Sequence, residues 1–134
     1  MVSYLMYKRV LIADDHATVR FLIRSLVENA GFTVCAEADD GTHAIEQAKG
    51  SHPDLILLDL SMPNMNGAEA ASVLKRMMPQ VPIILFTLHD DSISQRLAKA
   101  LGVDMVVAKS DGMTNLVGSM RILLGLSSVE SATK

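Results

Sequence analysis

The sequence is poor in cysteine and aromatic residues, and it lacks a large excess of charge of either sign. Its 134 residues include one cysteine, no tryptophan and 4% aromatic residues. A single cysteine, Cys35, cannot form an internal disulfide or a cysteine-based zinc site, which favours a reducing compartment. We expect it to be a small core residue. Twelve basic and 15 acidic residues give a net charge of −3. Because no basic tail or large Lys/Arg cluster is present, the composition argues against direct nucleic-acid binding.

Long apolar runs are also missing. The longest, such as residues 55–58 and 81–85, fall far short of the ~20 residues that a membrane-spanning helix needs. The N-terminal residues lack the pattern of a secretion signal. We therefore expect no membrane segment and a cytoplasmic location. The length and the 49% hydrophobic content predict one domain with its own core, over residues 1–126, followed by a polar tail or linker stub at 127–134.

Short apolar runs alternate with segments of helical periodicity. The runs predict buried parallel strands at residues 9–13, 32–36, 55–58, 83–86 and 105–108. The segments between them predict five helices, which end at Ala30 for the first and cover 42–49, 67–78, 91–101 and 114–124 for the others. Strand starts recur at roughly the spacing of one βα unit. The pattern predicts an α/β fold with a five-stranded parallel sheet flanked by five helices, doubly wound and flavodoxin-like.

Apolar spacing also predicts which side chains of the helices face the core. In the first helix the inward stripe is expected to contain Val19, Leu22, Ile23, Leu26, Val27 and Ala30. In the fourth it is expected to contain Ile93, Leu97, Ala100 and Leu101. Glycines 31, 50 and 102 follow helices and are expected to end them. The fifth helix carries two extra apolar residues, Val117 and Ile122, which point to a protein contact.

The strand ends carry the residues with chemistry. Asp14 and Asp15 follow the first strand, Asp59 the third, Thr87 the fourth and Lys109 the fifth. Open parallel α/β sheets bind ligands at the carboxyl ends of their strands, where the strand order reverses. Each residue alone has an ordinary explanation: the acidic pair could cap a helix, and Thr87 could be a simple strand residue. Their joint placement at four strand ends favours a site.

Three carboxylates at one rim would repel one another unless a cation offset their charge. Oxygen ligands of this kind suit Mg²⁺. Lys109 and the Thr87 hydroxyl could each bind a phosphoryl oxygen. Together these groups favour transfer of a phosphoryl group to a carboxylate. Nucleotide cofactors are not expected, because neither a Gly-rich dinucleotide fingerprint nor a P-loop is present.

The motifs resemble the receiver domain of two-component response regulators over roughly residues 8–124. The resemblance rests on the acidic pair within residues 11–16, the Asp-x-x-Met-Pro-x-Met-x-Gly run from Asp59 to Gly67, the pair Phe86–Thr87, and Lys109. The resemblance implies that Asp59 is the phosphoacceptor. It implies that Asp14, Asp15, Asp59 and the backbone carbonyl of Ser61 bind Mg²⁺, and that Thr87 and Lys109 bind the phosphoryl oxygens.

The resemblance further implies partners and a switch. The phosphoryl donor would be a histidine kinase or a histidine phosphotransfer protein. Movement of Thr87 would reshape the face made by the fourth helix, the fifth strand and the fifth helix, as a shift between two packings. A homodimer could use this face or the face of the first and fifth helices. Residues 88–91 and 109–112 resemble the subfamily whose receivers precede a helix-turn-helix DNA-binding domain, so residues 127–134 would begin a linker.

Three positions depart from the family pattern. Ser110 follows Lys109, where the family often has a proline in a cis bond, so that slow isomer is not expected. Val106 stands where an aromatic residue often moves with the threonine, so the usual aromatic switch is in doubt. Leu88 stands where many receivers have a small residue, and it is expected to restrict access to the site. Two alternatives stay open: a pseudo-receiver that binds partners without chemistry, and a phosphatase of the haloacid dehalogenase type. The second normally has an acid two residues after its nucleophile, where this chain has Ser61.

Overall fold

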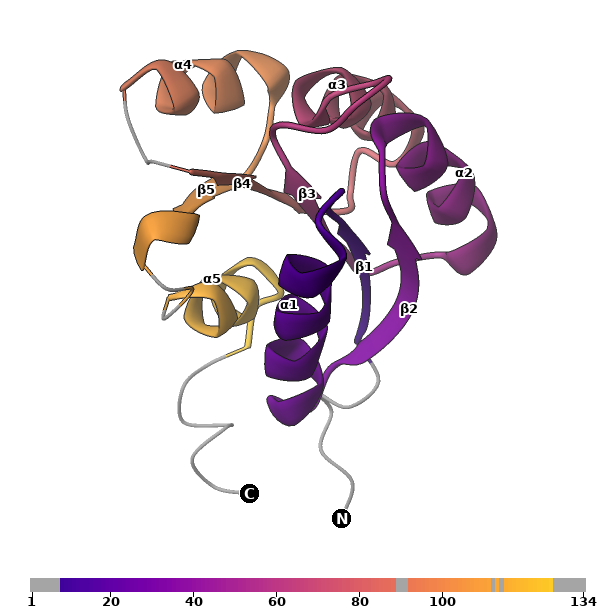
Figure 1. The fold of residues 1–134 in the computed structure, drawn as a ribbon, viewed down its shortest axis with the longest axis vertical. Coiled ribbons are helices and arrows are strands. Elements are labelled where there is room, and N and C mark those ends of the chain that lie inside the picture. The colour runs from indigo at the N-terminus through magenta and orange to yellow at the C-terminus, as the bar shows by residue number, and fades with distance from the viewer. Residues whose placement is uncertain (1–7, 89–91, 112, 114, 127–134) are drawn as a thin grey trace.

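The computed structural model describes residues 8–88, 92–111, 113 and 115–126. Within them, β-strands and α-helices alternate along the chain (Figure 1). The strands are β1 Arg9–Ala13, β2 Thr33–Ala38, β3 Leu55–Asp59, β4 Ile83–Thr87 and β5 Met105–Ala108. The helices are α1 Ala17–Asn29, α2 Gly41–Ser51, α3 Gly67–Met77, α4 Ser92–Leu101 and α5 Leu116–Leu123, with a short 3₁₀ helix, η2 Lys109–Asp111. The predicted starts of the fourth and fifth helices, Asp91 and Thr114, lie outside the described residues.

All five strands are parallel and form one sheet in the order β2-β1-β3-β4-β5. This confirms the predicted fold class. The order reverses at β1, because the chain runs outward to β2 and then returns to place β3 on the other side of β1. The carboxyl ends of β1 and β3 therefore flank the point where open α/β sheets bind ligands.

Alternate residues along each strand enter two separate cores, one on each face of the sheet. On one face, the sheet packs against α1 and α5 through Ile23, Val27, Leu116 and Met120. On the other, it packs against α2, α3 and α4 through Ala44, Ala48, Ala70, Ala71, Leu74 and Ala98. Figure 1 shows the two groups of helices on opposite sides of the sheet. Helices on both faces explain why the central strands read as continuous apolar runs.

The inward face of α1 is narrower than the apolar spacing predicts. Ile23 and Val27 are buried, but Leu22 is 61% exposed and Leu26 is 36% exposed. The prediction was wrong for these two leucines, because the sheet and α5 cover only one side of the helix. Gly31 has a positive φ of 101° and follows the helix as predicted.

The ends of α2 and β2 differ from the prediction. Gly50 does not end α2, which continues to Ser51 and is capped by His52 in the left-handed conformation, with φ 51°. Strand β2 runs two residues further than expected, to Ala38. Cys35 on this strand is only partly buried, because β2 lies at the edge of the sheet.

The buried faces of α3 and α4 also differ from the predicted ones. Met77 at the end of α3 is 37% exposed, although the spacing placed it inward. On α4, Ala100 is exposed, whereas Ser94 and Ala98 are buried. The inward face of α4 is thus turned relative to the predicted one, and it carries a serine. The side chain of Ile93 lies outside the described residues.

No helix within the described ranges is long and apolar enough to cross a bilayer.

Candidate functional site

The carboxyl end of β1 places one buried and one exposed carboxylate at the rim of the sheet. Asp14 is fully buried, whereas Asp15 is exposed. Oδ1 of Asp14 accepts a hydrogen bond from the backbone N–H of His16 at 2.9 Å. His16 precedes the first residue of α1, and its side chain does not cap that helix. The acidic pair therefore does not act as the side-chain cap of α1, the ordinary explanation weighed for it.

Arg20 on α1 holds the backbone of this turn. Its guanidinium donates to the carbonyl oxygen of Asp14 at 2.6 Å and pairs with Glu37 on β2 at 2.9 Å. Arg24, one turn later, pairs with the same glutamate. Glu37 therefore holds Arg20 in place while it pairs with both arginines. Sequence reasoning missed this contact, because it joins three elements that periodicity treats separately.

Asp59 ends β3 and is 3% exposed. The following loop returns closely to it. The backbone N–H of Gly67 donates to the carbonyl of Leu60 at 2.9 Å, and a Cβ at Gly67 would lie 2.2 Å from the carbonyl oxygen of Asp59. Only glycine fits this approach. The backbone N–H of Ser61 lies 3.4 Å from Oδ1 of Asp59.

Lys109, immediately after β5, connects the two buried carboxylates. Its Nζ lies 2.9 Å from Oδ2 of Asp14 and 3.2 Å from Oδ1 of Asp59. Burial and the charge of Asp14 raise the pKa of Asp59 above its ordinary value, and Lys109 opposes part of that rise. Burial lowers the pKa of Lys109, but its contacts with Asp14 and Asp59 outweigh that effect and raise it overall. A positive charge thus holds two buried negative charges together.

Thr87 ends β4, which lies between β3 and β5 in the sheet, and it is also buried. Its hydroxyl oxygen lies 3.4 Å from that of Ser94 on α4. Sequence reasoning did not find Ser94, because a serine on an apolar helix face carries no signal by itself.

These residues surround a pocket of about 240 Å³ at the carboxyl end of the sheet. It is lined by His16, Asp59, Leu60, Ser61, Thr87, Leu88 and Lys109. Leu88 is 66% exposed at this pocket, and its effect on access stays a prediction. The next predicted subfamily residues, 89–91, lie outside the described residues, as does Gly112.

The same rim offers a set of metal ligands. Four side chains have ligand atoms within 4.8 Å of one another, namely those of Asp14, Asp15, His16 and Asp59. Oδ2 of Asp59 is buried and has no hydrogen-bond partner among the described residues. A hard, oxygen-binding cation such as Mg²⁺ fits this set, because carboxylates dominate it and one buried carboxylate oxygen needs a partner.

The structure thus brings Asp14 and Asp59 each into contact with Lys109 and places Ser61 and Thr87 at the same pocket as Asp59 and Lys109. Asp15 contributes to the same acidic cluster. The role predicted for the backbone carbonyl of Ser61 stays a prediction, as do the roles of the other residues in chemistry.

Comparison with known proteins places this arrangement in a family. The family model described as "Response regulator receiver domain" matches residues 10–121. Response regulator GacA of Pseudomonas viridiflava is 32% identical over 117 residues, which cover 86% of this chain and 54% of GacA. The chain spans about half the length of the curated relatives it matches.

Solved structures agree. A two-component response regulator of the LuxR family from Aurantimonas sp. is 31% identical, with a TM-score of 0.80, and the match covers 93% of this chain and 92% of that one. The isolated receiver domain of RcsB from Salmonella enterica, with the phosphomimetic BeF₃⁻, is 29% identical, with a TM-score of 0.70 and coverage of 77% and 78%.

Receiver domains are signalling domains that are generally not classed as enzymes, and they bind Mg²⁺ at an acidic pocket. The family interacts with kinases, phosphotransfer proteins or output domains. The comparisons favour neither the pseudo-receiver nor the phosphatase alternative. This chain belongs to the response regulator receiver domain family.

Proposed function

We propose that this receiver domain accepts a phosphoryl group on Asp59 with the help of Mg²⁺. One observation carries the proposal: Lys109 joins Asp59 to Asp14 at distances of 3.2 and 2.9 Å, beside a compact acidic cluster. A structural ion pair alone would not require two buried carboxylates for one lysine. The excess negative charge suits a site that takes a cation.

The chemistry follows from these contacts. A carboxylate oxygen of Asp59 attacks the phosphorus of a phosphohistidine donor, forming an O–P bond while the N–P bond breaks and the electron pair leaves with the imidazole. Lys109 stays beside Asp59 and stabilises charge on a phosphoryl oxygen, and the Thr87 hydroxyl donates to another. Mg²⁺, held by Asp14, Asp15, Asp59 and the carbonyl of Ser61, would supply charge neutralisation during transfer.

We also propose partners and an output. The donor would be a histidine kinase or a histidine phosphotransfer protein in the cytoplasm. Residues 1–126 would form the receiver domain and 127–134 the start of a linker to a DNA-binding domain, as the similarity to a LuxR-family response regulator supports. Dimerisation through the α4/β5/α5 face or the α1/α5 face would then place two such domains together. The exposed Ile122 of α5 supports a contact on that helix.

Labelling tests the proposed function. The protein is incubated with Mg²⁺ and either acetyl phosphate or phosphoramidate, and the intact mass is measured over time. We expect one phosphoryl group to be added, and the addition to stop when Mg²⁺ is chelated. Labelling that survives Asp59→Asn would contradict the assignment.

A second variant tests access. Leu88→Ala should speed the reaction with these small donors if Leu88 restricts the pocket, and leave the single site of labelling unchanged. An unchanged rate would show that Leu88 does not control access.

A further inference from the structure

Two buried hydroxyl groups connect the site to α4. Thr87 at the end of β4 is 8% exposed, Ser94 in α4 is 7% exposed, and their oxygens lie 3.4 Å apart. A serine is uncommon on the buried face of a surface helix, because its hydroxyl must be hydrogen-bonded there. Here the Ser94 hydroxyl contacts Thr87, which is predicted to bind the phosphoryl group.

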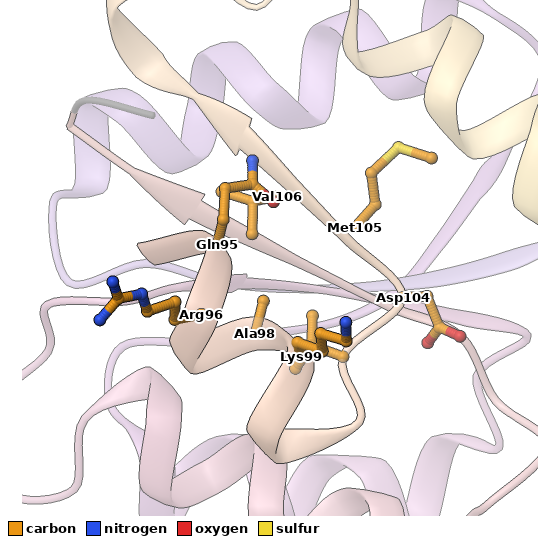
Figure 2. Close-up of a pocket in the computed structure, with 8 residues that line it drawn as sticks. Gln95, Arg96, Ala98, Lys99, Asp104, Met105 and Val106 are labelled. Carbon is orange, nitrogen blue, oxygen red and sulfur yellow. The ribbon is translucent and has the colours of Figure 1, made fainter. Parts of the chain in front are cut away.

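Ser94 lies on the helix that forms one wall of a second pocket. Ala98, one turn after Ser94, is buried on the same face of α4 and lines a groove of about 360 Å³ between α4 and β5. Figure 2 shows this groove, with Gln95, Ala98 and Lys99 from α4 and Val106 from β5 among its lining residues. A change in how α4 is held at Ser94 would therefore alter the groove.

Val106 on β5 is less suited than Ser94 to couple the site to the groove. Val106 is partly buried against the core on the α4 side of the sheet. Valine is stiff at χ1 and has no hydrogen-bonding group, so it cannot exchange partners when the site changes. The Thr87–Ser94 pair can, since each hydroxyl both donates and accepts.

The donor order of this pair depends on what occupies the site. Each hydroxyl has one proton to donate. An anionic phosphoryl oxygen is a stronger acceptor than a neutral hydroxyl, so Thr87 would donate to it. Thr87 can then only accept from Ser94, and the order becomes Ser94 to Thr87 to phosphoryl oxygen. Hydrogen bonds in such a chain strengthen one another.

We propose that Ser94 is a positioning residue that couples phosphorylation of Asp59 to the placement of α4 through the Thr87 hydroxyl. The proposal rests on the proposed function. In the phosphorylated protein, the Ser94 O–H orients Thr87 toward the phosphoryl oxygen and holds the first turns of α4 in one arrangement. The shape of the groove between α4 and β5 then depends on whether Asp59 is phosphorylated.

Backbone amide NMR of the 134-residue chain tests this, with Mg²⁺ and beryllofluoride as the probe, the phosphomimetic found with RcsB. In the wild type we expect shifts at residues around Asp59 and along α4. In Ser94→Ala we expect the shifts around Asp59 to remain, with the affinity for beryllofluoride lowered roughly five-fold by loss of one hydrogen bond. The shifts along α4 should largely disappear.

Three further variants separate coupling from simple destabilisation. Ser94→Thr keeps the hydroxyl and should restore the α4 response. Ser94→Cys keeps the size but donates weakly, so it should lose the response even where Ser94→Ala fails to fold. Ser72→Ala, a serine on α3, is the matched control and should behave as the wild type.

The outcomes are distinct. An α4 response in Ser94→Ala or Ser94→Cys equal to that of the wild type would overturn the coupling role. Absence of any shift around Asp59 in the wild type would overturn the proposed function itself. Shifts around Asp59 in both proteins, with an α4 response only where position 94 carries a hydroxyl, would support the proposal.

Discussion

The two sides of the pocket are held in different ways. On one side, Asp14, Asp59 and Lys109 are tied by ion pairs of 2.9 and 3.2 Å, and Arg20 fixes the backbone of Asp14. On the other side, Thr87 makes a neutral hydroxyl contact with Ser94 at 3.4 Å. Ion pairs and backbone contacts keep one arrangement, whereas a hydroxyl pair can change its donor order at little cost. The first side is suited to binding, and the second to responding.

Removing the charge at the centre of the binding side should have the largest effect. In Lys109→Met two buried carboxylates would face each other without a cation, and we expect a loss of about 2–4 kcal/mol in the free energy of unfolding. Urea unfolding at neutral pH measures it. Saturating Mg²⁺ should restore more stability to this variant than to the wild type, because the metal replaces the lost charge.

Lys49→Met, at an exposed position of α2, is the control and should unfold as the wild type does. Equal stability of Lys109→Met and the wild type without Mg²⁺ would show that the ion pairs do not hold this side together.

Crowding the loop behind Asp59 should have the next largest effect. A methyl group at position 67 would lie 2.2 Å from the carbonyl oxygen of Asp59, so Gly67→Ala should cost about 1–3 kcal/mol and slow phosphorylation. Gly50→Ala in α2 is the matched control, since nothing lies within 4 Å of its Cβ position. It should be neutral or stabilise by roughly 0.5 kcal/mol. Similar melting temperatures for the two variants would contradict this reading of the loop.

Loosening the backbone of Asp14 should have a smaller effect, seen in metal binding. Arg20→Ala removes the donor to the Asp14 carbonyl and leaves Glu37 paired with Arg24 alone. We expect roughly ten-fold weaker Mg²⁺ binding, as for other residues that support metal ligands. Titration calorimetry measures it, with Arg76→Ala on α3 as the control. Unchanged affinity would limit Arg20 to a structural role.

The smallest expected effect on stability comes from Asp40, which caps α2 and also forms a hydrogen bond with the loop after β3. Asp40 accepts from the N–H of His43 and from the side chain of Asn64, each at 2.8 Å. These bonds hold its pKa below the ordinary 3.8. The stability they add is therefore present at neutral pH and is lost as the pH falls through the lowered folded-state pKa.

Thermal unfolding of the wild type and Asp40→Asn from pH 7 to pH 3 tests this. The melting temperatures should differ at neutral pH and approach each other at the acid end. A constant difference across that range would mean that ionisation of Asp40 does not contribute.

The fold and the residues of the binding side, Asp14, Asp59 and Lys109, could be predicted from the sequence for the same reason. Buried parallel strands give continuous apolar runs, and the residues that interrupt those runs, Asp59 above all, must have a charged partner. Topology then brings Asp14 and Lys109 to it without further information. The surface leucines were harder, because spacing shows that Leu22 is apolar but not how far neighbouring helices extend over it.

The responding side could not be predicted. Apolar periodicity in α4 favours Leu97 and Ala100 over Ser94, and the buried face is decided only when the helix packs on β4 and β5. Arg20 escaped notice similarly, since its partners Asp14 and Glu37 come from two strands. Contacts between polar groups of separate elements leave no period in the sequence.

The central claim is that Asp59 carries the phosphoryl group, and chemical trapping locates it most directly. The protein is phosphorylated with a small donor and Mg²⁺, reduced with borohydride to convert an acyl phosphate into an alcohol, digested and sequenced by mass spectrometry. The account predicts reduction at residue 59 and nowhere else. Recovery of unmodified Asp59 together with phosphate on Ser61, Thr87 or another residue would contradict it.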